Sequence, residues 1–163
     1  MTKEMHGLLT ASAAALLLLA CGPAAPASAA DTIKIGAPFN VTGSLSSTDA
    51  PALNGAKLKA KEINDAGGIA GKKLELVVYD TKSDPTVVAS VASQLVNQDK
   101  VPVALGFTDS DSALALGPIF QQAGIPFLTP GATSPKLPEQ VGNDMFLACF
   151  GDNVQAAAGA DFV

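Results

Sequence analysis

Residues 53–80 constrain the fold more than any other segment, because they combine a helical pattern, a glycine-rich turn and an apolar strand. One face of the predicted helix is apolar, as a helix covering a sheet requires, and it is formed by Leu53, Ala56, Ala60 and Ile63. The turn supplies the positive φ angles that end a helix, and its glycines are Gly67, Gly68 and Gly71. Residues 74–79 are nearly all apolar, which is typical of a strand covered on both faces. This unit predicts an α/β architecture.

The rest of the chain alternates strand and helix patterns in the same way. Strands are predicted at 33–37, 73–80, 101–105, 125–128 and 145–150, and helices at 51–65, from Pro85, up to Ala123 and from Asp152. Asp84 is the expected N-cap of the second helix and Asp152 that of the last one. Residues 41–50 and 129–142 are predicted loops. Helical crossovers between strands predict a single α/β domain with a doubly wound parallel sheet.

The composition excludes several classes of function. The formal net charge is −5 and no arginine is present, so no basic surface for nucleic acid is predicted. The only histidine, His6, precedes the predicted mature chain, which leaves no histidine base or metal ligand. Gly71-Lys72 is not a phosphate-binding loop, because no Ser or Thr follows the lysine. Asp109 and Asp111 are interpreted as helix-capping groups, so no catalytic residue, cofactor or metal site is predicted.

Residues 1–30 are predicted to be a signal peptide. Residues 8–20 form an apolar run too short to span a bilayer as a mature helix, and Ala27-Ser28-Ala29 provides a cleavage site. The alternative is a lipoprotein signal in which Cys21 becomes lipidated. Both interpretations predict export from the cytoplasm. If Cys21 is removed, Cys149 is the only remaining cysteine, and it is expected to be a buried structural thiol.

Three predicted loops at the carboxyl ends of strands are rich in hydroxyl groups. They comprise residues 41–50, 106–112 and 129–134. Ligands of doubly wound sheets bind at this edge, and hydroxyl and backbone N–H groups beside a helix N-terminus can hold a carboxylate without a cationic side chain. The alternative is that these are ordinary loop residues, since Ser, Thr and Gly are common in loops.

Several segments in register resemble one known family. They are IKIGAPFNVTGSLSS, NGAKLKAKEINDAGGIAGKKLELVVYD, GFTDSDSA and AGIPFLTPGATSP. Their order and spacing are similar to those of the periplasmic leucine/isoleucine/valine-binding family, the solute receptors of ABC importers. The resemblance implies a type I periplasmic binding fold, of which this chain is the first lobe with the second lobe mostly missing. Residues 31–150 then form the N-terminal lobe, and residues 151–163 begin the second one.

The resemblance also implies a ligand site and partners. Ser110 corresponds to the serine that binds the ligand carboxylate, and Gly131 and Thr133 to positions that meet its amino and carboxylate groups, with Ala132 between them. Thr48 stands where many members place an aromatic residue. The implied function is that of a monomeric extracytoplasmic receptor that delivers an amino acid of the branched-chain type, or a related carboxylate or amide, to an ABC permease. The alternatives are a ligand-sensing domain of a membrane receptor and an α/β enzyme.

The chain departs from the family pattern at two places. Many amino-acid receptors have a disulfide between the positions that Ser83 and Asp109 occupy here. Asp109 and Asp111 also place negative charge beside the predicted carboxylate site, so a carboxylate ligand requires that both side chains face elsewhere.

Overall fold

Residues 32–163 are described by a computed structural model, in which five parallel strands form one sheet of order β2-β1-β3-β4-β5. The strands are β1 (Ile33–Phe39), β2 (Leu74–Asp80), β3 (Ala104–Leu105), β4 (Phe127–Thr129) and β5 (Met145–Leu147). The prediction of a doubly wound parallel sheet is therefore confirmed. The predicted signal peptide and Cys21 lie outside the described residues.

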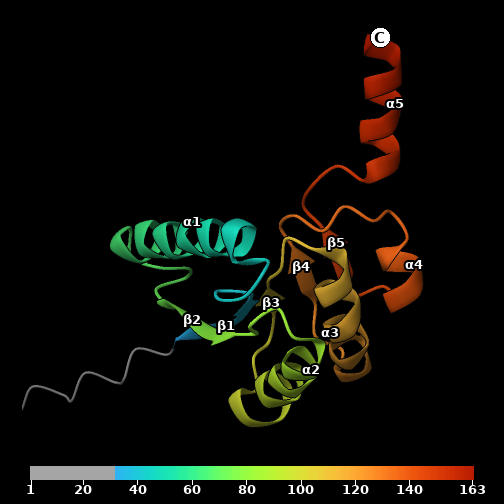
Figure 1. Cartoon of the computed structure of the whole chain (residues 1–163). Helices are drawn as coiled ribbons and strands as arrows, with labels where there is room; N and C mark the ends of the chain where they lie inside the picture. The colour runs from blue at the N-terminus through green and yellow to red at the C-terminus, as the bar shows by residue number, and fades with distance from the viewer. Residues whose placement is uncertain (1–31) are drawn as a thin grey trace, which may run out of the picture. The chain divides into compact units, whose positions relative to one another are not determined.

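Helices cover the two faces of the sheet unequally. The elements are α1 (Ser46–Asp65), α2 (Pro85–Gln94), the π-helix η1 (Leu95–Asp99), α3 (Ser110–Ala123), α4 (Leu137–Val141) and α5 (Asp152–Phe162). Figure 1 shows α1 on one side of the sheet and α2 and α3 on the other. As predicted, Asp84 caps α2 by accepting a hydrogen bond from the amide of Thr86 at 2.8 Å.

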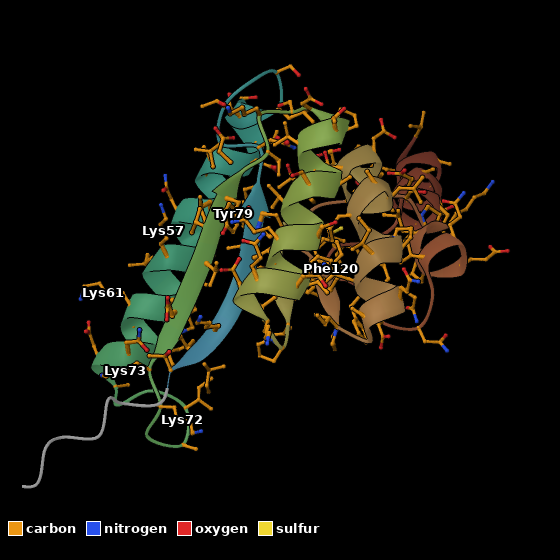
Figure 2. All side chains as sticks on the ribbon, turned by 90° about the horizontal axis from the view of Figure 1, so that it is seen from below. Lys57, Lys61, Lys72, Lys73, Tyr79 and Phe120 are labelled. Atoms are coloured by element: carbon orange, nitrogen blue, oxygen red, sulfur yellow. The ribbon has the colours of Figure 1, made fainter. Side chains whose placement is uncertain are left out.

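The larger part of the core lies between the sheet and the pair α2 and α3. The ring of Phe127 on β4 packs against Phe107 and Phe120, with centroids 6.4 and 5.9 Å away. On the edge strand β2, the hydroxyl of Tyr79 donates to Asp99 of η1 at 3.0 Å. Figure 2 labels Tyr79 and, on α3, Phe120. Burial and the neighbouring Asp99 raise the pKa of Tyr79. These contacts fix α2 and α3 against the strands that precede the candidate site.

The first helix begins earlier than predicted. Residues 46–50 were expected to be loop, but they form the first turn of α1. The reason is a tertiary contact: the carboxylate of Asp49 is fully buried and accepts hydrogen bonds from the amides of Asn40 and Thr108, both at 2.7 Å. These bonds hold residues 46–50 in helical conformation, although the segment lacks an apolar helical pattern.

Four smaller expectations also differ from the structure. The short helix α4 lies within the predicted loop 129–142, and η1 extends α2 by a turn that no pattern indicated. The predicted strands at 101–105 and 145–150 pair only at Ala104–Leu105 and Met145–Leu147. Asp152 is the first residue of α5 and not its cap, which is Gly151. None of these differences changes the strand order or the positions of the three loops.

One face of β4 and β5 carries exposed apolar side chains. Leu105, Leu128 and Phe146 are cross-strand neighbours on this face. Leu105 packs against the cluster beneath α1, whereas Leu128 is 37% exposed and Phe146 50% exposed. No residue of α5 is buried, so this helix does not cover the two side chains. A parallel sheet is normally covered on both faces, and here the cover ends at β3.

The exposed apolar face formed by Leu128 and Phe146 predicts that residues 31–163 self-associate. We expect their weight-average sedimentation coefficient to rise with concentration, because association removes the apolar surface of Leu128 and Phe146 from water. The double variant Leu128→Thr/Phe146→Thr should reduce that rise, whereas Leu58→Thr, an isolated exposed position on α1, should not. Concentration-independent sedimentation of the unmodified chain would contradict the prediction.

Candidate ligand-binding edge

The strand order reverses between β1 and β3, which makes the carboxyl ends of these strands the expected ligand site. The chain turns from β1 toward α1 and β2 on one side, and from β3 toward α3 and β4 on the other. Gly43 is required in the first of these loops, because its φ is +88° and a Cβ there would lie 2.4 Å from the carbonyl oxygen of Lys82. The loops after β1 and β2 therefore pack closely together.

Ser110 and the loop after β4 meet at this edge, as the sequence predicted. Ser110 is the first residue of α3, and its Oγ accepts a hydrogen bond from the amide of Ser134 at 3.2 Å. Gly131 lies against Thr108, since a Cβ at Gly131 would be 2.9 Å from the Thr108 Cβ. Only glycine permits this close approach of the two loops.

Ala132 and Thr133 have different environments although they are adjacent. Ala132 is fully buried, its amide donates to the Thr129 hydroxyl at 3.0 Å, and its carbonyl accepts from the Cys149 thiol at 3.1 Å. Cys149 was expected to be buried but is only half-buried, and its thiol is hydrogen-bonded within the protein. Thr133 is half-buried, and among residues 32–163 no hydrogen bond engages its hydroxyl. The side chain of Thr133 is therefore available to a ligand, as is that of Ser134, whose hydroxyl is likewise not engaged among the described residues.

Thr48 lies in the first turn of α1, beside the segment that leads to Ser110. Its hydroxyl donates to the carbonyl of Leu45 at 2.9 Å, and the residue is exposed. Its neighbour Asp49 accepts from both the amide and the hydroxyl of Thr108, which brings this turn to the loop after β3. The structure therefore brings together the Thr48 turn, Ser110 and the loop that carries Thr133.

The two acidic residues beside Ser110, Asp109 and Asp111, have different environments. Both carboxylate oxygens of Asp109 are engaged within the protein: Oδ1 accepts from the amide of Ser112 at 2.7 Å, and Oδ2 from Asn40 Nδ2 at 3.0 Å. Asp109 is the N-cap of α3, as predicted. Asp111 was expected to cap the helix as well, but it lies exposed in the first turn and makes no capping hydrogen bond. The amides of Ser110 and Asp111 precede the first intrahelical bond and have no partner among the described residues.

Most lysines lie away from this edge. Figure 2 shows Lys57 and Lys61 on α1, and Lys72 and Lys73 in the turn before β2, at the amino end of the sheet. The exposed Lys82 follows the carboxyl end of β2, and the exposed Lys136 follows the loop after β4. An anion at the candidate site would therefore be held mainly by hydroxyl and amide groups.

Asp80 organises the loops after β1 and β2. Its carboxylate accepts from the hydroxyl of Thr42 at 2.6 Å, from the amide of Thr42 at 3.1 Å and from the amide of Lys82 at 2.9 Å. Partial burial acts to raise the pKa of Asp80, but these hydrogen bonds, with one from the Val41 amide, outweigh it and lower the pKa below the ordinary value.

Two residues at the edge were missed by the sequence analysis. Asn40 and Asp49 are fully buried, and each bonds to residues far away in the chain. The only local signal for Asn40 is that a polar residue directly follows an apolar strand. Asp49 carried no signal, because the segment around it had been interpreted as loop.

Comparison with known proteins identifies the family. Residues 32–163 match the family described as periplasmic binding protein. The chain belongs to the periplasmic binding protein family. It is 35% identical over 122 residues to an amino acid binding protein of Pseudomonas aeruginosa, an alignment that covers 75% of this chain and 33% of the relative. A leucine-, isoleucine-, valine-, threonine- and alanine-binding protein of the same organism is 33% identical over 162 residues, covering 99% and 42% of the two chains.

Solved structures of family members support the same assignment. LivJ of Streptococcus pneumoniae, a branched-chain amino acid transporter substrate binding protein in complex with isoleucine, has a TM-score of 0.72 and 38% identity. That comparison covers 75% of this chain and 35% of LivJ. A solute binding protein of Rhodopseudomonas palustris in complex with 3,4-dihydroxybenzoic acid has a TM-score of 0.65 and 28% identity, over 74% and 32% of the chains. The present chain thus spans well under half the length of these family members.

A substitution at Asp80 tests the electrostatics of the loop it organises. The folded-state pKa lies below that of the unfolded chain, so the carboxylate adds stability above the unfolded pKa, and this contribution is lost as the pH falls through the folded pKa. We expect Asp80→Asn to lower the melting temperature at pH 7, and the difference from the unsubstituted protein to shrink in acid. Asp161→Asn, an exposed change near the end of α5, is the control. A difference that grows on acidification would contradict the assignment.

Proposed function

We propose that this chain forms the first lobe of an extracytoplasmic receptor that delivers a small solute to an ABC permease. The solute class is an amino acid of the branched-chain type or a related carboxylate, and the receptor acts as a monomer without enzymatic activity. In this proposal residues 31–150 form the lobe and residues 151–163 begin a second one. Family membership and the names of the relatives support this function.

One observation carries the proposal: hydroxyl and free amide groups from three separate loops gather at the strand-reversal point. Ser110 Oγ bonds the amide of Ser134, and Gly131 contacts Thr108, so the start of α3 with its unpaired amides adjoins the loop of Gly131 and Thr133. Thr48 lies in the first turn of α1, whose Asp49 also bonds Thr108. Backbone N–H groups at a helix N-terminus are well suited to a carboxylate, because the helix dipole favours negative charge there. Ala132 contributes by holding the loop backbone, since both of its polar groups are bonded within the protein.

The chemistry of the relatives narrows the choice of probes. One similar structure contains isoleucine and another contains 3,4-dihydroxybenzoic acid, and both ligands carry a carboxylate. Thr48 leaves more room than the aromatic residue that many family members have at this position. L-leucine, L-isoleucine and 3,4-dihydroxybenzoate are therefore the first compounds to titrate.

Removing the two ligand-facing hydroxyls tests this function. In the protein expressed from its own gene, Ser110→Ala and Thr133→Ala should each weaken L-leucine binding by roughly 1–3 kcal/mol, because each removes a hydrogen bond to a charged group. Isothermal titration calorimetry measures the change, with Ser90→Ala on the exposed side of α2 as the control. No binding of any of the three probes would overturn the proposed function, and unchanged affinity in both variants would overturn the site.

Export is part of the proposal and has its own test. Cleavage after Ala29 or Ala30 would release a mature chain that begins at Ala30 or Asp31. We expect mass spectrometry of the exported protein to find that N-terminus. A diacylated peptide that begins at Cys21 would instead establish the lipoprotein alternative, and an uncleaved protein in the cytoplasm would contradict both.

A further inference from the structure

A buried amide side chain links three loops of the candidate site. Asn40 directly follows β1 and is fully buried. Its Oδ1 accepts hydrogen bonds from the Thr81 hydroxyl at 2.7 Å and the Ser83 amide at 3.0 Å. Its Nδ2 donates to Asp109 Oδ2 at 3.0 Å and to Ser112 Oγ at 3.3 Å. All four hydrogen-bonding positions of the amide are therefore used, and they join the loop after β2 to the start of α3.

A buried carboxylate completes the same network from the side of α1. Asp49 Oδ2 accepts from the amide of Asn40 at 2.7 Å, and Oδ1 accepts from the amide of Thr108 at 2.7 Å and from its hydroxyl. Among residues 32–163 the salt bridges are Lys59–Glu62 and Lys61–Asp65, so Asp49 is held by hydrogen-bond donors and not by a cation. Such charge-assisted bonds are short and directional.

The network surrounds Ser110 in the chain. Thr108, Asp109 and Ser112 are each bonded to Asn40 or Asp49, and Ser110 lies between them. No buried side-chain N or O atom of the described residues lacks a hydrogen-bond partner, so the network is fully satisfied. A fully satisfied buried network fixes its members more rigidly than separate pairs would. The positions of the Ser110 hydroxyl and of the free amides of α3 follow from this network.

We propose that Asn40 and Asp49 are positioning residues of the ligand site, which hold Ser110 and the start of α3 in the geometry that binds the ligand. The ligand part of this inference rests on the proposed function. Asn40 bonds both Ser83 and Asp109, the two positions at which the family pattern has a disulfide. A hydrogen-bonded amide thus joins the two loops in this chain, and a covalent bridge should be able to replace it.

The first test uses the free protein and requires no ligand. Hydrogen–deuterium exchange followed by mass spectrometry should show faster exchange of residues 81–84 and 106–113 in Asn40→Ala and Asp49→Asn. Thr81→Val is a milder variant, because it removes only the hydrogen bond from the Thr81 hydroxyl to Asn40. It decides the test if Asn40→Ala and Asp49→Asn fail to fold. Thr86→Val, at an exposed position of α2, is the matched control and should leave exchange in these loops unchanged. Unchanged exchange in Thr81→Val and in every other folded variant would overturn the inference.

The second test separates positioning from general stability. We expect Asn40→Ala to weaken L-leucine affinity by roughly tenfold, and to have a clearly smaller effect when Ser110→Ala is already present, since coupled residues are not additive. Additive effects would show that Asn40 acts on stability alone. If the unsubstituted protein does not bind L-leucine, that result counts against the proposed function. The exchange experiment, which uses no ligand, would still decide the positioning inference.

The third test is a rescue. Ser83→Cys/Asp109→Cys in the Asn40→Ala background should regain L-leucine affinity when oxidised and lose it again on reduction. Thiol titration verifies that the new bridge has formed and that Cys149 remains reduced. The reference is the same oxidised double variant with Asn40 present, because Asp109→Cys also removes the cap of α3. A verified bridge that brings the Asn40→Ala protein no closer to this reference, in affinity or in the exchange of residues 106–113, would overturn the inference.

Discussion

The position of β1 between β2 and β3 is the constraint on which the rest of the structure depends. β1 pairs with β2 over its whole length, from Ile33–Leu74 to Phe39–Asp80, and with β3 at Gly36–Ala104. Because the order reverses at this strand, the chain leaves β1 and β3 toward opposite sides. The first turns of α1 and α3 consequently flank one point of the sheet edge. Thr48 and Ser110 lie in the turns that this reversal brings together, and the loop of Gly131 and Thr133, which follows the neighbouring strand β4, contacts the start of α3.

The same arrangement leaves backbone amides at the strand ends without sheet partners, and the side chains of Asn40 and Asp49 accept their hydrogen bonds. Strands that end beside one another leave backbone groups without sheet partners, and these groups are costly when buried. The amides of Asn40, Ser83 and Thr108 find side-chain acceptors within the cluster. Apolar replacements of Asn40 and Asp49 would leave these amides without acceptors, which is costly in a buried site. The network therefore both satisfies the strand ends and defines where the loops stop.

The fold was largely predictable from apolar patterns, because periodicity is local and strong in α1, α2 and β2. The start of α1 was not predictable, since residues 46–50 are helical only through bonds that Asp49 makes with Asn40 and Thr108. Ser110, Gly131 and Thr133 were placed near one another by the family resemblance, and the structure brings their loops into contact. Asn40 was missed because the partners of its side chain lie 41 to 72 residues away, a separation that no local pattern reports.

The charges at the edge favour a zwitterionic ligand over a simple anion. Asp80 and Asp109 are satisfied by donors within the protein, yet their negative charge still contributes to the potential of the edge, with Asp49 buried beside them. Asp111 adds to this potential from the first turn of α3, and the exposed Lys82 offsets part of it. Free amides and hydroxyls supply directional bonds for a carboxylate, while the surrounding negative potential attracts an ammonium group. A ligand with a carboxylate but no ammonium group gains only these hydrogen bonds, and the negative potential repels it. The charge pattern of this edge therefore agrees with the α-amino acid class that we propose for the solute.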